Sequence, residues 1–387
     1  MSLREPAGVI EHRLLGHGLT SSIIFWLALV DRLTVNLALV PTLTATRAGR
    51  DAWLAFLASI PAALAVGWIM AYVTRAAPGE GLARQAQRAL GPIGGTLVAL
   101  AFTWSYLHLT FLMVREYAEV IVTVGLPNTP LVVIVSTVVL VAYVMALQDT
   151  PAMARTVLIL GPIVILAVVS VLASVAPQAD LAILRPVLGG GWSPLASGVL
   201  SASIWHSVVY FYPAVSPSIV DHARATRALL GGLICATLLS AALSAEAVAV
   251  LGPLGAVRHQ FPLYQMARLV MVGELVQRLD LLALAAWGLG LLVGASLHLH
   301  AAALCLADLV DLRDHRLLVK SLALLVAVGA MLVGHNVMEL REFTDVRTLL
   351  PYVALHLWVP TATWALGTRA RLKQSSTGRA HDPGEAR

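Results

Sequence analysis

Charged side chains are scarce in this chain. Asp, Glu, Lys and Arg together make up 12% of its 387 residues, about half the share found in typical globular proteins. Hydrophobic residues make up 58%, and the mean hydropathy is +0.82. A water-soluble domain of this size needs more charge to cover its surface, whereas a chain surrounded by lipid does not. The composition therefore predicts an integral membrane protein.

The chain is also poor in the groups that carry covalent or metal chemistry. Its two cysteines, Cys235 and Cys305, lie inside apolar runs and are interpreted as small core side chains rather than a redox or metal pair. P-loop, HExxH, GxSxG and CxxC motifs are absent from the sequence. The net charge is +5, but the basic residues lie in short loops without interleaved aromatic residues. We therefore expect no enzyme activity, metal, cofactor or nucleic-acid partner.

What is abundant is long apolar runs. A membrane-spanning helix needs roughly 20 apolar residues. About ten such spans are expected, near residues 19–45, 52–74, 95–124, 129–148, 156–176, 195–220, 227–251, 279–307, 317–337 and 349–367. Residues 80–91 and 253–278, which connect spans, have the spacing of helices that lie at the membrane surface. We expect residues 1–370 to form one transmembrane domain and the polar residues 371–387 to form a disordered cytoplasmic tail.

The distribution of Lys and Arg predicts the orientation. With the N-terminus inside, the cytoplasmic segments carry about twice as many basic residues as the outer loops. An even number of spans places both ends of the chain on the cytoplasmic side, in agreement with ten spans. The sequence thus predicts a multi-pass membrane protein with both termini cytoplasmic.

The first span contains Asp31 and Arg32 near its middle, where charges are expensive. One interpretation is an adjacent pair that neutralises itself at a helix contact. Neighbours on a helix point about 100° apart, so they pair poorly unless the backbone departs from the helix. The other interpretation is therefore a helix break near residues 31–36, whose freed backbone groups line a cavity.

The sixth span contains two prolines, Pro213 and Pro217, next to His206, Ser207 and Tyr210. Proline removes a helical hydrogen bond, which predicts either a packed kink or a discontinuous helix lining a site. The first and sixth spans occupy equivalent positions if residues 19–176 and 195–367 form an inverted repeat. Disrupted helices at corresponding places in two halves are typical of a transporter binding site.

Other polar residues inside spans need an explanation too. Arg115 and Glu116 in the third span are interpreted either as interfacial residues or as coupling groups. Glu246 in the seventh span is a lone carboxylate that either takes part in proton movement or pairs with an arginine. These groups have no role in a plain lipid-facing helix.

Several segments resemble a known family. They are Leu39–Pro41 with Ala48–Trp53, Arg115–Glu116 with Leu126–Pro130, Ala154–Arg155 with Gly161–Pro162, and Phe261–Leu263 with Glu274 and Arg278–Asp280. Their order and spacing are similar to those of spore germination permeases, the B subunits of GerA-type nutrient receptors. This family belongs to the amino acid–polyamine–organocation transporter superfamily. The resemblance covers about residues 15–370.

The resemblance implies an all-α fold like the ten-helix core of the leucine transporter, a 5+5 inverted repeat with discontinuous helices one and six. It implies a site between spans one, three, six and eight that binds a small germinant, commonly an amino acid. It also implies a complex with an A subunit and a lipoprotein C subunit in the inner spore membrane. This chain departs from the family pattern at Arg32–Asn36, where small residues are usual, and at Trp205–Ser207, where an acidic group is usual.

The sequence thus predicts a germinant-receptor subunit, with an amino-acid permease working by alternating access as the alternative and a purely structural membrane subunit as a third possibility. The residues expected to bind the ligand are Asp31, Thr34, Val35, Asn36, Tyr106, Trp205, His206, Ser207, Tyr210 and Ser296. Those expected to act in structure or coupling are Arg32, Arg115, Glu116, Pro213, Pro217 and Glu246.

Overall fold

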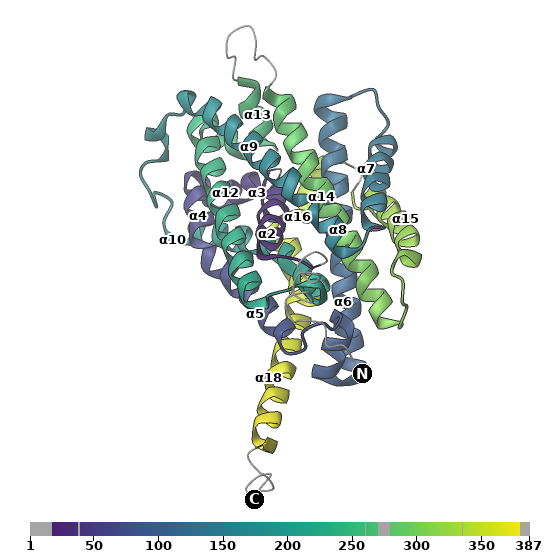
Figure 1. Cartoon of the computed structure of the whole chain (residues 1–387). Helices are drawn as coiled ribbons and strands as arrows, with labels where there is room; N and C mark the ends of the chain where they lie inside the picture. The colour runs from purple at the N-terminus through teal and green to yellow at the C-terminus, as the bar shows by residue number, and fades with distance from the viewer. Residues whose placement is uncertain (1–17, 38, 260, 270–278, 335, 380–387) are drawn as a thin grey trace, which may run out of the picture.

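The computed structural model describes residues 18–379, apart from residues 38, 260, 270–278 and 335 (Figure 1). Within that part of the chain the regular structure is helical, and the β-type pairing is one isolated bridge between Leu19 and Ile219. Five helical stretches are long and apolar enough to cross a membrane: Leu39–Arg75, Leu82–Gly125, Thr150–Gln178, His222–Arg258 and Leu279–Leu309. The predicted all-α membrane fold is confirmed.

Helices lie in every range where a span was expected. In the first half they are α2 (Ser21–Asn36), α3 (Leu39–Ala48), α4 (Ala52–Ala58), α5 (Ile60–Arg75), α6 (Leu82–Val120), α7 (Leu131–Ala146), α8 (Thr150–Arg155) and α9 (Val157–Val175). In the second half they are α10 (Trp192–Ile204), α11 (Phe211–Val215), α12 (His222–Arg258), α14 (Leu279–Leu309), α15 (Arg316–Leu332), α17 (Val346–Val353) and α18 (Val359–Arg379). Two further helices, α13 (Pro262–Leu269) and α16 (Val337–Thr344), lie in connections.

The outer helices carry their apolar side chains on the surface. On α9, Ile159 and Leu166 are each 69% exposed, whereas Val164 and Val168 on the opposite face are buried. Water-soluble proteins rarely expose large contiguous apolar patches, because such patches promote association. An apolar outer face on such a helix is what lipid requires. The core is filled mainly by α2, α6 and α14, which lie in the middle of the bundle.

Two long helices change direction at a Gly-Pro pair. Gly91 in α6 has φ +77° and precedes Pro92, and Gly252 in α12 has φ +72° and precedes Pro253. Glycine tolerates this left-handed conformation, and the proline that follows supplies no helical N–H. Residues 82–90 therefore form a separate short helix before the third span, as the spacing in residues 80–91 predicts. Part of the surface helix predicted in 253–278 is α13, while residues 270–278 lie outside the described residues.

The C-terminal helix extends further than the sequence suggested. Helix α18 continues through Arg379 and projects from the end of the bundle (Figure 1). The polar tail predicted from residue 371 is thus helical at its start, and residues 380–387 lie outside the described part. Beyond Gly367, most residues of α18 have a high helix propensity, which explains why the helix continues.

Candidate functional site

The first span is broken after Asn36. Helix α2 ends there and α3 begins at Leu39, so the helix is continuous through Asp31 and Arg32. The break predicted near residues 31–36 therefore lies slightly too early. Side chains from two other helices bind the backbone groups beside the break. Trp287 of α14 donates its indole N–H to the carbonyl of Thr34 at 3.0 Å, and Glu116 of α6 accepts the Leu39 N–H at 3.0 Å.

The sixth span is broken as well. Helix α10 ends at Ile204, a 3₁₀ segment runs over Trp205–Tyr210, and α11 follows. Tyr106 of α6 donates its hydroxyl to the carbonyl of Tyr210 at 2.7 Å. Pro213 lies in α11 and Pro217 lies in the next turn, so both prolines follow the unwound segment. The predicted discontinuity of the first and sixth helices is confirmed, although the 3₁₀ segment precedes the prolines.

Arg32 is fully buried and ties the broken helices together. Its Nε donates to Nδ1 of His206 at 3.0 Å, an Nη donates to the Asn36 side-chain carbonyl, and the other donates to the Ala202 carbonyl at 3.3 Å. Since His206 Nδ1 accepts, its Nε2–H donates to Ser59 at 3.0 Å. A buried guanidinium needs such partners because an unpaired charge in the membrane interior is strongly unfavourable.

Asn36 extends this network to α12. Its amide group donates to the Ser240 hydroxyl at 2.5 Å, and Ser240 in turn donates to the Ala236 carbonyl at 2.7 Å. The network therefore links the first, second, sixth and seventh spans by a continuous chain of hydrogen bonds. A motion of the first span has to carry these four spans together or break the bonds.

Asp31 and His298 face each other without a hydrogen bond. Asp31 Oδ2 lies 3.6 Å from His298 Nε2, and both residues are at most 1% exposed. His298 Nδ1 lies 2.8 Å from the Gly294 carbonyl, which only accepts, so Nδ1 carries a proton. Neither carboxylate oxygen of Asp31 has a hydrogen-bond partner among the described residues. This pair is the most unusual polar arrangement of the site.

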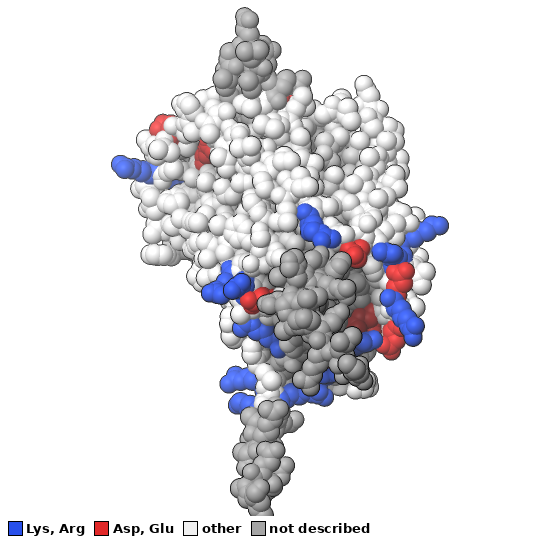
Figure 2. Space-filling view, viewed as in Figure 1, with Lys and Arg blue, Asp and Glu red and all other residues white. Residues whose placement is uncertain are grey.

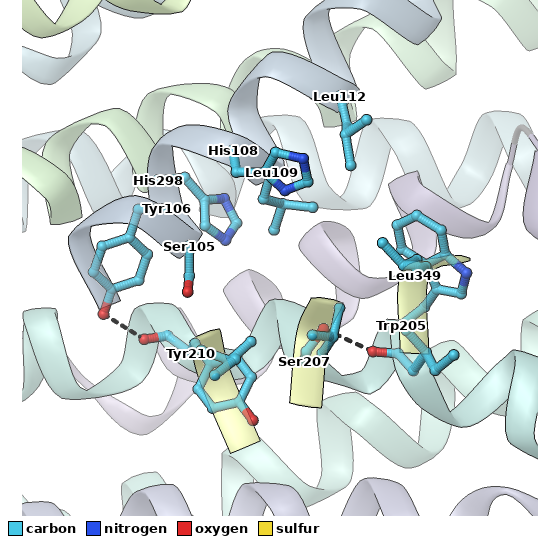
Figure 3. Close-up of a pocket in the computed structure, with 13 residues that line it drawn as sticks. Ser105, Tyr106, His108, Leu109, Leu112, Trp205, Ser207, Tyr210, His298 and Leu349 are labelled. Atoms are coloured by element: carbon cyan, nitrogen blue, oxygen red, sulfur yellow. Dashed lines mark hydrogen bonds between the residues drawn. The ribbon is translucent and has the colours of Figure 1, made fainter. Parts of the chain in front are cut away.

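A cavity lies between the broken sixth span, α6, α14 and the tenth span (Figure 3). Its volume is about 40 Å³, and Tyr106 and His298 lie on one side of it with Ser207 and Tyr210 on the other. The remaining lining residues are Ser105, His108, Leu109, Leu112, Ile204, Trp205, Leu349, Val353 and Leu357. None of these lining residues is acidic. The cavity is thus mostly apolar, with hydroxyl, imidazole and indole groups at its wall.

The structure brings four of the expected ligand-binding residues to this cavity, namely Tyr106, Trp205, Ser207 and Tyr210. His206 instead binds Arg32 and Ser59. Ser296 does not line the cavity, because its hydroxyl binds the Leu292 carbonyl at 2.5 Å and contacts Met145 of α7. The expected residues of α2, which are Asp31, Thr34, Val35 and Asn36, are buried beside the cavity and do not line it.

The sequence reasoning missed His298 and His108 as cavity residues. Ser296 and His298 are two positions apart, which is about 200° around a helix, so only one of them can face the site. The three residues Leu349, Val353 and Leu357 share one face of the tenth span at a spacing of four residues. The sequence therefore showed that these three residues share a face, but it did not show that this face of the tenth span turns toward the cavity.

The other expected coupling residues lie farther from the cavity. Arg115 pairs with Glu119 one turn along α6 at 3.0 Å and is 2% exposed. Glu246 is half-buried on α12, and its Oε1 has no hydrogen-bond partner within the described residues.

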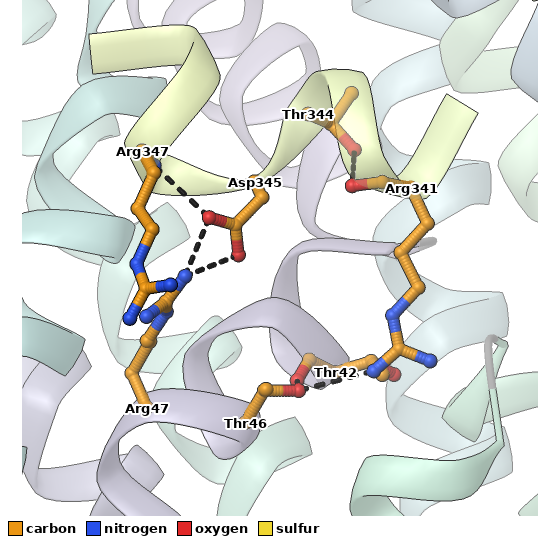
Figure 4. Close-up of polar contacts among 7 residues, drawn as sticks. All are labelled: Thr42, Thr46, Arg47, Arg341, Thr344, Asp345 and Arg347. Atoms are coloured by element: carbon orange, nitrogen blue, oxygen red, sulfur yellow. Dashed lines mark hydrogen bonds and ion pairs between the residues drawn. The ribbon is translucent and has the colours of Figure 1, made fainter. Parts of the chain in front are cut away.

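An ion pair connects the first span to the connection before the tenth (Figure 4). Arg47 of α3 contacts Asp345 at 2.5 Å, and Asp345 also accepts the Arg347 backbone N–H at 3.0 Å. Burial raises the pKa of Asp345. The hydrogen bonds from Arg347 and Arg47 together lower it by more than burial raises it, so the pKa lies below its usual value. Arg341 contacts Thr46 at 3.2 Å on the same surface. These contacts hold α3 of the first span against α16 and the start of α17.

The fold and the site together define a membrane protein of the transporter type. The chain superimposes on a sodium-coupled sialic acid symporter in a substrate-bound outward-open state with a TM-score of 0.59, at 10% identity, covering 89% of this chain and 88% of that one. It also superimposes on a manganese transporter of Eremococcus coleocola with a TM-score of 0.55, at 14% identity, covering 99% and 91% of the chains. These likenesses establish the leucine-transporter type of fold.

Sequence comparison identifies the family. Residues 18–337 match the family described as spore germination protein, and the chain belongs to that family. It is 22% identical over 361 residues to spore germination protein KB of Bacillus subtilis (strain 168), which covers 90% of this chain and 96% of that protein. It is also 23% identical over 121 residues to spore germination protein XB of Bacillus anthracis, covering 31% and 34% of the two chains.

Proposed function

We propose that this chain is the membrane subunit of a spore nutrient receptor, and that a small germinant, in the first instance an amino acid, binds in the cavity beside the broken helices. The observation that carries the proposal is the position of the cavity. Tyr106 and His298 on unbroken helices face Ser207 and Tyr210 on the unwound segment, so a ligand there contacts both parts of the bundle. A ligand placed so can shift one part against the other.

The size of the cavity supports a receptor that moves on binding. A volume of about 40 Å³ holds about three water molecules, which is less space than an amino acid needs. Binding therefore requires the walls to separate. This separation first strains the hydrogen bond from the Tyr106 hydroxyl to the Tyr210 carbonyl, because that bond joins α6 to the sixth span on opposite sides of the cavity. In this account, germinant binding changes the geometry of the sixth span and thereby signals.

The lining also favours one kind of ligand chemistry. Its hydroxyl, imidazole and indole groups donate hydrogen bonds, and it contains no acidic side chain to bind a cation. We infer that the carboxylate of a germinant binds to these donors. An ammonium group would compete with the Tyr106 hydroxyl for the Tyr210 carbonyl in the sixth span.

The same proposal covers the partners and the membrane. We infer an A subunit and a lipoprotein C subunit as partners, a location in the inner spore membrane, and both termini on the cytoplasmic side. The basic residues support the orientation, because Lys and Arg gather at the end of the molecule from which α18 projects (Figure 2). Genes for both partner subunits beside this gene would support the complex.

A germinant screen tests the receptor role. Spores with and without the gene are exposed to single nutrients, and germination is followed by loss of refractility. We expect at least one amino acid to lose its effect in spores without the gene and to regain it on complementation. Spores that lack the gene and still respond normally to every nutrient would contradict a sensing role.

An amino-acid permease with alternating access is the second candidate. The Asp31–His298 pair favours it, because a carboxylate and an imidazole that face each other at 3.6 Å can hold a proton between them for coupled transport. Uptake of labelled amino acid by the purified chain in liposomes, driven by a pH gradient, would support the permease. Binding without uptake would support the receptor.

A further inference from the structure

A second cavity lies at the end of the bundle from which α18 projects. It has a volume of about 440 Å³, within the range of small-molecule sites, and lies between the end of α5, the short helix that opens α6, and α18. Its wall is apolar at Val73, Ala76 and Leu372, and two guanidinium groups, from Arg88 and Arg371, lie at its edge. None of these residues belongs to the germinant cavity.

The two arginines are in different states. Arg88 forms an ion pair with Glu80, so its charge is partly neutralised. Arg371 is exposed, and no acidic group among the described residues lies within ion-pair distance of it. Within the described residues, one positive charge is therefore uncompensated beside the cavity. A partner with negative charge stabilises such a group.

Gln85 contributes an unsatisfied acceptor to the same cavity. Its Nε2 donates to the Glu80 carbonyl at 2.5 Å and to the Ser216 hydroxyl at 3.3 Å. Because the Glu80 carbonyl only accepts, these contacts fix which end of the amide is nitrogen. Gln85 is 3% exposed, and its Oε1 has no hydrogen-bond partner within the described residues. A ligand with a hydroxyl donor can supply what this oxygen lacks.

The lipid-facing surface continues from the cavity along α5. Trp68, 56% exposed, stacks on Tyr72 with ring centroids 5.4 Å apart, and Val73 and Ala76 of the cavity wall follow directly. Exposed Trp and Tyr residues are typical of the boundary between headgroups and acyl chains. The cavity therefore lies at the depth of lipid headgroups, next to an apolar surface suited to acyl chains.

We propose that this cavity binds the headgroup of an anionic phospholipid of the phosphatidylglycerol type. Arg371 and Arg88 bind the phosphate, and a glycerol hydroxyl donates to Gln85 Oε1. The acyl chains lie along Trp68 and Tyr72. A basic pocket between membrane helices suits such a headgroup because each arginine near the surface strengthens the binding of anionic lipid.

Lipid binding to the purified full-length chain in detergent tests the proposal. Bound lipid is counted by native mass spectrometry during titration with phosphatidylglycerol, with phosphatidylcholine and with inorganic phosphate. We expect saturable binding of phosphatidylglycerol and weaker binding of phosphatidylcholine. The Arg371→Gln variant should weaken phosphatidylglycerol binding about fivefold, and Arg88→Gln with Arg371→Gln should weaken it further.

Two further variants separate the cavity from general charge. Arg369→Gln removes the same charge from the same helix but outside the cavity, and should change the affinity less than twofold. Ala76→Trp keeps both arginines and fills the cavity at an exposed position, and should abolish saturable binding. Thermal unfolding without lipid checks that each variant folds.

Three results would overturn the proposal. The first is equal weakening by Arg369→Gln and Arg371→Gln, which would indicate a diffuse electrostatic effect. The second is unchanged binding in a folded Ala76→Trp variant. The third is competition by inorganic phosphate at the same concentration as lipid, which would indicate a site for free phosphate.

Discussion

The hydroxyl of Tyr106 donates a hydrogen bond to the backbone carbonyl of Tyr210 at 2.7 Å. Tyr106 lies on the continuous helix α6, and Tyr210 closes the unwound segment of the sixth span. Tyr210 precedes the first residue of α11, and the Tyr106 side chain on a neighbouring helix fixes the position of its carbonyl. Helices α6 and α14 thus hold the broken spans in place through the side chains of Tyr106, Glu116 and Trp287, which bind backbone groups.

Replacement of Tyr106 by Phe tests this contact. The buried Tyr210 carbonyl loses the bond from the Tyr106 hydroxyl while the ring remains, so we expect destabilisation of about 0.5–1.5 kcal/mol. Thermal unfolding of the purified chain measures the effect. Tyr72→Phe is the control, since it removes a hydroxyl from a half-buried ring at the lipid surface. Equal unfolding temperatures for Tyr106→Phe and the wild type would contradict the role of this bond.

Replacement of Arg32 by Gln should be far more damaging. The change removes the buried positive charge that follows Asp31 along the chain, and it removes donors from His206 and the Ala202 carbonyl. Loss of a buried charged group from its network costs up to about 3–5 kcal/mol, so we expect little folded protein. The amount of folded protein recovered by size-exclusion chromatography measures this.

A double variant separates charge from hydrogen bonding. Asp31→Asn together with Arg32→Gln restores a net charge of zero at the site, and we expect it to recover part of the lost stability. Recovery no better than in the single Arg32→Gln variant would show that the hydrogen bonds, and not the charge balance, dominate.

The Arg47–Asp345 ion pair should control access to the cavity from its end of the molecule. In a background without Cys235 and Cys305, a cysteine is introduced by Ser207→Cys and labelled with a small thiol reagent. We expect Arg47→Asp to raise the labelling rate several-fold, because like charges then face each other across the closed contact. The swap of Arg47→Asp with Asp345→Arg should restore slow labelling. Fast labelling in the swapped variant would contradict the assignment.

The spans were predictable from the sequence because lipid imposes long apolar runs on every outer helix. The Asp31–Arg32 pair and the prolines also indicated which two spans are broken. The position of each break was not predictable, since it depends on partners from distant helices, such as Glu116 for Leu39 and Tyr106 for Tyr210.

The choice of cavity residues depended on helix rotation, which periodicity does not determine in a helix that is apolar on all sides. Helix α14 is buried over most of its length, so Ser296 and His298 gave the same signal although they face different neighbours. In contrast, the 3₁₀ segment around Ser207 turns most of its polar residues to the site, and three of the residues expected there line the cavity.

Two serines of the sixth span distinguish the cavity from the rest of the bundle as the germinant site. Ser203 and Ser207 are both half-buried, and each donates to a backbone carbonyl, of Val199 at 2.6 Å and of Ile204 at 2.7 Å. Only Ser207 lines the cavity. The measurement is the nutrient concentration that gives half-maximal germination, in spores carrying Ser207→Val or Ser203→Val, for the nutrient found in the deletion screen.

We expect Ser207→Val to raise this concentration about tenfold, because extra volume in a small cavity costs about 1–3 kcal/mol of binding free energy. Ser203→Val should change it less than twofold at the same level of protein in the spore membrane. Equal concentrations for the two variants would contradict the assignment of the germinant site to this cavity.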